Sequence, residues 1–405
     1  MSCRTSTSSA DKTCTLKLLD TAGQARKTAL WFNSAMGKMA CPVCGGKMKG
    51  HGTTAAGSKR WQCTSCGATA TRKLDSAAKG LKAFLDWLLS PSPQAAMPGG
   101  GRTFRRKAER YWKIWPIAPV CDERLHVVHV DGIWLGRACV MLIAVSGERV
   151  AGWHLARSEC SASWGALMSR IAPPDVVVCD GGPGFEKARR EHWPDARVQR
   201  CTFHAFGQVK RCTTTRPNLQ AGVELYGIAK DLLKVADANA AAEWLASFAS
   251  WCGRWDAFLK EREPDGAGWR WKHERLRKAR RGLEKLCRSG ELFTFLDPEL
   301  AAGGPIPSTN NRIEGLNSRL RELLRRHRGM PIDHRVKAMS WWLYMRTEEP
   351  MSAAEIMREM PTDESIAALY TKVDGMRRND EAVQRWGAAV AWEEFHTQEW
   401  RQRNW

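Results

Sequence analysis

Four cysteines in two pairs are the residues whose spacing points most directly to a chemistry. Cys41 and Cys44 form one Cys-x-x-Cys pair, and Cys63 and Cys66 form a second pair after eighteen intervening residues. Two residues between thiolates let both sulfurs turn toward one centre, so four thiolates with no open position indicate a structural zinc ion in a zinc ribbon. Disulfide bonds are the alternative, although no other feature of the sequence suggests export.

The charge of the chain indicates a polyanionic partner. Its 405 residues include 63 Lys and Arg against 43 Asp and Glu, a net charge of +20, which favours nucleic acid and a salt-sensitive affinity. Within the ribbon we expect Arg60 and Trp61 to contact DNA. The sequence has neither an apolar run long enough to span a membrane nor an N-terminal secretory signal, so we expect a cytoplasmic location.

Two aspartates are candidates for metal chemistry. Asp131 and Asp180 each end a predicted strand and precede a glycine. If the two strands are neighbours, the carboxylates lie side by side and repel, and a shared divalent cation such as Mg²⁺ or Mn²⁺ relieves the repulsion. An Asp-Gly pair is also an ordinary turn signal, so each aspartate taken alone is more simply structural.

A predicted helix over residues 310–327 supplies a third carboxylate, Glu314. Ser308 or Thr309 is placed to cap this helix. Its apolar stripe consists of Ile313, Leu316, Leu320 and Leu323. Glu314 lies beside this stripe and shares a face with Asn310 and Asn317, which predicts a polar patch at the edge of the core.

The same helix carries several arginines, of which we expect Arg312 and Arg319 to contact DNA phosphates. Glu322 is the nearest competitor to Glu314, but it has no asparagine companions. A solvent-exposed helical glutamate without a chemical role is the simpler alternative.

Apolar runs predict the elements that position the aspartates. The expected strands cover residues 125–130, 138–145, 150–155, 176–179 and 197–203, and the expected helices between them cover 162–171 and 185–192. Short turns between the first three strands predict an antiparallel meander, and the intervening helices predict that the last two strands are crossover strands. This order is that of a ribonuclease H-like domain, of the α+β or α/β class.

The remaining patterns predict the domain organisation. We expect a poorly ordered extension at 1–39, the ribbon at 40–72, a helical region at 73–116, catalytic core at 120–212 and 308–350, a helical insertion at 213–307 and a helical tail at 351–405. The insertion places Trp244, Phe248, Trp251 and Trp255 on one helical face, which favours the core of a helix bundle. The region 73–116 is compatible with a helix-turn-helix and equally with a plain helical linker. Its basic residues Arg102, Arg105 and Arg106 are expected DNA contacts.

Several of these motifs together resemble a known family. Asp131-Gly132, Cys179-Asp180-Gly181-Gly182 and the segment from Thr309 to Gly315 resemble the DDE transposases of bacterial insertion sequences related to the Mutator superfamily. Cys201 and His204 look like the Cys-x-x-His element that this superfamily carries between its second aspartate and its glutamate. The ribbon in front marks a zinc-ribbon subgroup, and the resemblance covers about residues 40–345.

The resemblance implies a DNA transposase. Asp131, Asp180 and Glu314 would hold two Mg²⁺ or Mn²⁺ ions for cleavage at the terminal inverted repeats and transfer of the 3′-hydroxyl into target DNA. It further implies one structural Zn²⁺, double-stranded DNA as partner, a homodimer or larger assembly on that DNA, and a nucleoid-associated protein of the bacterial cytoplasm.

Other interpretations stay open at this point. Cys201 and His204 are half of a metal site, a structural pair or residues that order the active site. The whole chain also fits a non-catalytic zinc-ribbon DNA-binding protein, or a ribonuclease H-like nuclease without strand transfer.

Overall fold

The computed structural model describes residues 44, 46–55, 57–71 and 76–377. The chain divides into two compact units, Met1–Ser76 and Ala77–Trp405. The predicted extension at 1–39, Cys41 and residues 378–405 of the predicted tail lie outside the described residues. No helix in the described part is both long and apolar enough to cross a membrane.

The first unit contains a small antiparallel sheet. Its strands are β1 (Met48–Thr53), β2 (Lys59–Cys63) and β3 (Thr69–Thr71). Met48 and Cys63 are buried at its centre, and Trp61 packs against them. Gly67 directly follows the second cysteine pair with φ 72°, a turn conformation that strongly favours glycine.

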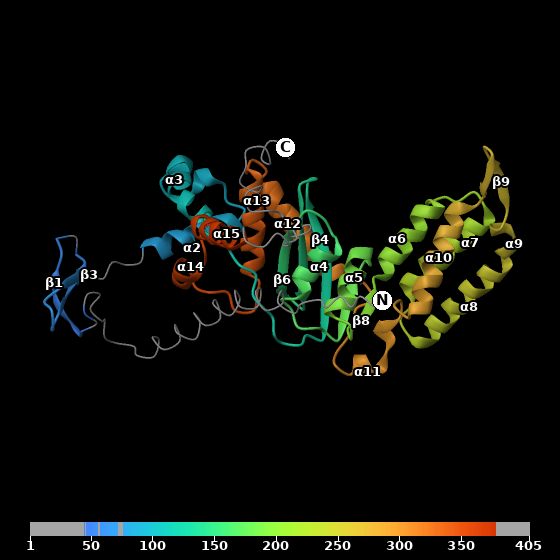
Figure 1. The fold of residues 1–405 in the computed structure, drawn as a ribbon, viewed down its shortest axis with the longest axis horizontal. Coiled ribbons are helices and arrows are strands. Elements are labelled where there is room, and N and C mark those ends of the chain that lie inside the picture. Colours follow the sequence, from blue (N-terminus) through green and yellow to red (C-terminus); the bar gives the residue numbers. More distant parts are fainter. Residues whose placement is uncertain (1–43, 45, 56, 72–75, 378–405) are drawn as a thin grey trace, which may run out of the picture. The chain divides into compact units, whose positions relative to one another are not determined.

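The second unit is built on a five-stranded mixed sheet (Figure 1). Its strands are β4 (Val127–Leu135), β5 (Cys139–Ser146), β6 (Arg149–Ala156), β7 (Val176–Cys179) and β8 (Arg197–Arg200). The first three pair antiparallel, whereas β7 pairs parallel with β4 and β8 pairs parallel with β7, giving the order β6-β5-β4-β7-β8. The predicted meander with two crossover strands is therefore confirmed.

Helices cover both faces of this sheet because its strands alternate between two apolar cores. Along β4, Val128 and Val130 face one core, and Ile133 and Leu135 face the other. The first core packs under α4 (Ser161–Met168) and α5 (Pro183–His192). The second core packs under α2 (Ser76–Leu89), α3 (Gly100–Trp112), α12 (Asn311–Arg326) and α13 (Ile332–Tyr344).

The two helices predicted within 73–116 are present as α2 and α3. Phe84 of α2 and Trp112 of α3 meet edge to face, with ring centroids 4.8 Å apart, in the same core as α12 and α13. The opposite face of α3 leaves Arg102, Arg105 and Arg106 exposed. Two further helices follow α13, namely α14 (Ala353–Glu359) and α15 (Asp363–Arg377).

The insertion, which lies between β8 and α12 in the sequence, forms a helix bundle of its own (Figure 1). Its helices are α6 (Thr202–Thr213), α7 (Gln220–Asp231), α8 (Ala238–Arg254), α9 (Asp256–Leu259) and α10 (Glu274–Ser289), followed by α11 (Pro298–Ala301). Two short 3₁₀ helices, η3 (Leu232–Lys234) and η4 (Thr294–Leu296), also belong to the insertion, whereas η2 (Gln94–Ala96) lies between α2 and α3. Trp244, Phe248 and Trp251 are buried in the bundle, with Trp255 packed against it, as their helical spacing predicted.

Three details differ from the sequence expectations. The insertion is not all helical, because β9 (Arg262–Asp265) and β10 (Gly268–Trp271) form a hairpin whose turn uses Gly266 at φ 60°. The last sheet strand ends at Arg200, since residues 202–213 form α6. Asp131 does not end its strand, because β4 continues to Leu135 and keeps pairing with β5.

A buried lysine joins α13 to α3 and to the start of α15. Lys337 of α13 is 2% exposed, and its Nζ donates to the carbonyl of Trp112 at 2.6 Å and to both carboxylate oxygens of Asp363 at 2.6 and 2.7 Å. Replacing it leaves the buried carbonyl and the carboxylate without their donor.

We therefore expect Lys337→Met to lower the free energy of unfolding by about 3 kcal/mol, measured by urea unfolding with tryptophan fluorescence. Lys113→Met is the matched control, because Lys113 pairs with Glu364 on the exposed surface of the same region and should matter little. Equal stability of Lys337→Met and the unchanged protein would contradict this account.

Candidate active site

Strand register brings the two aspartates to adjacent positions. β4 and β7 pair in parallel with His129 opposite Val178, so the register carried two residues further places Asp131 opposite Asp180. Asp180 directly follows β7, and Gly181 turns the chain away from the sheet with φ 81°. A side chain at Gly181 would also collide with the buried guanidinium of Arg200. Both the positive φ and the lack of space therefore require glycine at this turn.

Asp131 lies in an environment that disfavours its charged form. Burial raises its pKa to about 6, and the negative charge of Asp180 adds to this effect. Two donors act in the opposite direction: the Gly132 N–H reaches Oδ1 at 2.8 Å, and Asn317 Nδ2 reaches Oδ2 at 2.8 Å. Each oxygen of the Asp131 carboxylate thus accepts one hydrogen bond, which fixes its orientation, but both donors are neutral.

Asn310 holds the start of α12 against β4. Its side chain is fully buried, and Nδ2 donates to the Val130 carbonyl at 2.9 Å, which fixes the orientation of the amide. Oδ1 therefore faces His129 Nδ1 at 3.0 Å, so the neutral imidazole donates from that nitrogen. The Asn310 backbone N–H in turn donates to Cys201 Sγ at 3.2 Å, which ties α12 to the start of α6.

The expected cap of α12 is wrong in one respect. The helix is preceded by Asn310 as its N-cap residue, not by Ser308 or Thr309, and the Asn310 side chain makes no cap hydrogen bond because it is engaged by β4. The backbone carbonyl of Ser308 accepts from the Thr202 N–H at 3.0 Å, which again joins this segment to α6.

From α12, Asn317 contacts Asp131 and Glu314 faces His204 of α6, and three polar atoms of this region make no hydrogen bond. Within the described residues, Glu314 Oε1, Asn317 Oδ1 and His204 Nδ1 are buried and make no hydrogen bond. Glu314 Oε1 and His204 Nδ1 lie 3.7 Å apart, close enough for attraction but too far for a hydrogen bond. Asn317 Oδ1 belongs to the amide that contacts the buried Asp131, so an acceptor without a donor lies next to that carboxylate, an arrangement that suits a cation.

Cys201 and His204 occupy the first turn of α6 and meet Glu314. Their ligand atoms and a Glu314 oxygen lie within 4.8 Å of one another, so the partner of the Cys-x-x-His pair is the predicted catalytic glutamate. Hydrogen bonding with Cys201 raises the pKa of His204, and the charges of Asp180 and Glu314 add to this. Burial opposes ionisation of Cys201, but donors including His204 and Asn310 lower the pKa of its thiol overall.

The three carboxylates themselves do not form a group within 4.8 Å in the described part of the chain. The contacts that connect them are indirect: Asn317 binds Asp131 from the helix of Glu314, and His204 responds to the charges of both Asp180 and Glu314. Their joint coordination of metal ions therefore stays a prediction.

Sequence reasoning missed Glu159, which lies between β6 and α4. Its Oε1 accepts from Trp134 Nε1 at 2.8 Å, and a Cβ added at Gly132 would approach the same oxygen to 2.7 Å. Burial raises the pKa of Glu159, and Asp180 raises it further. No periodic pattern surrounds Glu159 in the sequence, so only the placement of Gly132 beside this loop reveals that a fourth carboxylate adjoins the site.

The first unit contains a second metal-binding arrangement. Cys44, Cys63 and Cys66 bring their sulfurs within 4.8 Å of one another, a cluster that can hold a metal ion, while the predicted fourth ligand Cys41 lies outside the described residues. Cys44 Sγ and Cys63 Sγ are 3.5 Å apart, well beyond a disulfide bond. Beside them Arg60 is exposed and Trp61 is half-buried.

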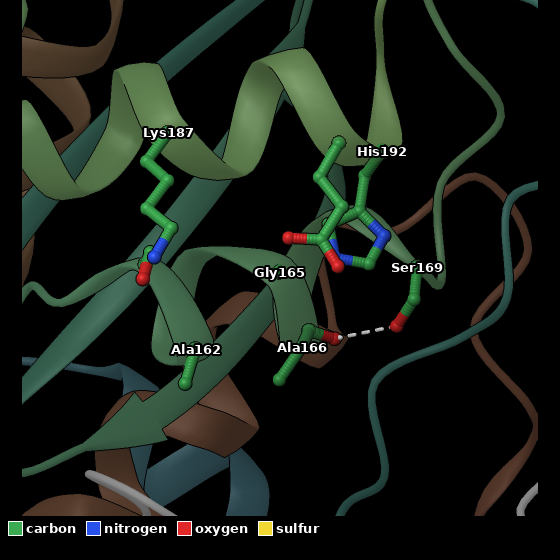
Figure 2. Close-up of a pocket in the computed structure, with 8 residues that line it drawn as sticks. Ala162, Gly165, Ala166, Ser169, Lys187 and His192 are labelled. Atoms are coloured by element: carbon green, nitrogen blue, oxygen red, sulfur yellow. Dashed lines mark hydrogen bonds between the residues drawn. The ribbon is translucent and has the colours of Figure 1, made fainter. Parts of the chain in front are cut away.

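A separate hollow of about 340 Å³ lies between α4 and α5 (Figure 2). Lys187 and His192 of α5 stand over the small residues Ala162, Gly165 and Ala166 of α4. None of the three predicted catalytic carboxylates lines this hollow, so it is not where the chemistry proposed for them would occur.

Comparison with known proteins gives no relative: no protein-family model matches the chain, and no curated protein matches it.

The role of Asn310 leads to a test that is independent of function. Asn310→Ala would leave the Val130 carbonyl and His129 Nδ1 buried without partners, so we expect a loss of about 2 kcal/mol or more in unfolding free energy. Asn311→Ala, at the adjacent exposed position, should be close to neutral. Urea unfolding of both variants checks this, and similar midpoints would show that the Asn310 contacts do not position α12.

Proposed function

We propose that the chain is a DNA transposase of the DDE type, with a ribonuclease H-like catalytic core. The strand order β6-β5-β4-β7-β8, with helices on both faces, supports that assignment of the core. The observation that carries the functional proposal is Asn317 Oδ1, which is buried without a hydrogen bond on the amide that holds Asp131, on the same helix as Glu314.

These residues fit divalent metal ions. Carboxylate and amide oxygens are preferred ligands of Mg²⁺ and Mn²⁺, and Asp131, Asp180 and Glu314 would hold two such ions. When bound, the ions would offset the repulsion between the carboxylates and stabilise the negative charge that develops on phosphate oxygens.

The chain's own residues would do the positioning. Asn317 fixes one oxygen of Asp131, and the Gly132 N–H fixes the other, so the carboxylate has a single orientation. Asn310 fixes the start of α12 against β4, and hence the position of Glu314 relative to that strand. In the proposed reaction, water displaces a 3′-oxygen from phosphorus at the element end, and the released 3′-hydroxyl then displaces a 3′-oxygen in target DNA.

The first unit would act as a zinc ribbon that contacts DNA. Three thiols already converge, and Cys41 would complete a tetrahedral Zn²⁺ site. Exposed Arg60, and exposed Arg102, Arg105 and Arg106 on α3, would contact phosphates. We place the protein in the bacterial cytoplasm on the nucleoid, acting as a homodimer or larger assembly that joins two DNA ends.

The central test is loss of each carboxylate in turn. Asp131→Ala, Asp180→Ala and Glu314→Ala should each reduce Mg²⁺-dependent strand cleavage by roughly a thousandfold or more and leave DNA binding intact. Cleavage of labelled duplexes carrying the element ends measures this, with Glu322→Ala as the control on the same helix.

The outcomes test the site and separate the candidate functions. A variant that still cleaves removes its residue from the site. Cleavage without joining of the 3′-end to target DNA would leave a ribonuclease H-like nuclease, and binding without any cleavage would leave a DNA-binding protein with a structural ribbon.

The ribbon makes its own prediction. We expect one zinc ion per chain by elemental analysis, and we expect Cys63→Ser to lose that ion together with the ordered sheet of the first unit. Cys139→Ser is the control, because Cys139 is buried in the sheet of the second unit away from any thiol cluster in the described residues. Retention of zinc by Cys63→Ser would rule out the proposed ligand set.

A further inference from the structure

A basic groove lies along the side of α12 that faces away from Glu314. It encloses about 500 Å³ between α12, α13 and the turn that joins β5 to β6. Its charged lining includes Arg312, Arg319 and Arg346. At about 100° per residue, positions 312 and 319 share one face of the helix, whereas 314 lies on the opposite face.

The positive charges in this groove are poorly neutralised by the protein. Among the described residues, no carboxylate forms an ion pair with Arg319 or Arg346. Burial lowers the pKa of Arg346, and the charge of Arg319 lowers it further. Arg312 pairs with Glu148 at the rim, where the Glu148 side chain is 84% exposed. Two guanidiniums held together without an acid between them favour a bound anion.

The groove is also preorganised. The Arg346 guanidinium lies 3.5 Å from the centroid of the Trp342 ring, and its Nη1 donates to the Trp342 carbonyl at 3.0 Å. Asn311 and Arg312 of the N-terminal turn of α12 line the groove, and the N-cap residue makes no side-chain hydrogen bond to the free N–H groups of this turn. The positive end of a sixteen-residue helix therefore adds to the three arginines.

We propose that this groove binds the phosphodiester backbone of the DNA strand that is cleaved on the other face of α12. Arg312 and Arg319 are seven residues apart, about 10 Å along the helix, a spacing that suits several phosphates better than one small anion. A helix is about 10–12 Å across, and a strand advances about 3.4 Å per nucleotide along a duplex. The contacted phosphates would thus lie about three nucleotides from the cleaved one. The identity of the strand rests on the proposed function, whereas the groove's affinity for DNA does not.

The test uses the full-length chain and two surface arginines. Arg312→Gln/Arg319→Gln changes only exposed side chains, and we measure duplex DNA binding by fluorescence anisotropy at several salt concentrations without divalent metal. We expect the affinity to fall roughly tenfold or more. The slope of log affinity against log salt concentration should become smaller in magnitude by about two, one for each arginine removed. Arg190→Gln/Lys234→Gln removes the same charge from exposed ion pairs elsewhere and should leave both quantities nearly unchanged.

Two further arms locate the contact. Glu148→Gln removes the carboxylate that competes for Arg312, so its DNA affinity should rise severalfold. A neutral methylphosphonate linkage about three nucleotides from the cleavage site should weaken binding of the unchanged protein, but weaken the double arginine variant much less.

The proposal fails if the double arginine variant behaves like its charge-matched control, or if the neutral linkage weakens both proteins equally. It also fails if inorganic phosphate binds at these arginines while DNA affinity does not depend on them. Failure of the proposed function gives a different pattern, because the unchanged protein would then bind DNA through the groove yet cleave nothing with Mg²⁺.

Discussion

The side chain of Asn310 is the interaction on which the candidate site depends. It joins residues 180 positions apart by donating to Val130 on the central strand and accepting from His129, both inside the core. A buried amide with both ends satisfied permits only one position of the following helix, because any shift would leave polar groups unpaired. That position gives α12 two polar faces: one carries Asn317 against Asp131 and Glu314 against α6, and the other lines the arginine groove.

The electrostatics of the site are unbalanced without a ligand. Asp131, Asp180 and Glu159 influence one another inside a partly buried region, while Glu314 and Asn317 each retain an oxygen with no donor among the described residues. His204, whose pKa is raised by its hydrogen bond with Cys201 and by the nearby carboxylates, lies with Cys201 beside Glu314. An arrangement that gathers acceptors and lacks donors is stable when a cation completes it.

The sequence predicted the sheet well because its signals were local. The run 176–179 and the three meander strands carry continuous or alternating apolar patterns, and the insertion core followed from helical spacing. Asp131 was misplaced at a strand end because Asp-Gly is a turn signal, yet Ile133 and Leu135 continue the buried alternation. Glu159 and the Cys201–Glu314 contact depend on how distant segments pack, and no local pattern encodes that.

Anomalous diffraction from crystals of the full chain grown with Mn²⁺ tests the central claim most directly. The account predicts manganese density in contact with Asp131 and Asp180, with Glu314 or an adjoining water completing the coordination. Density confined to Cys201, His204 and Glu314, or none beside Asp131 at saturating Mn²⁺, would contradict it.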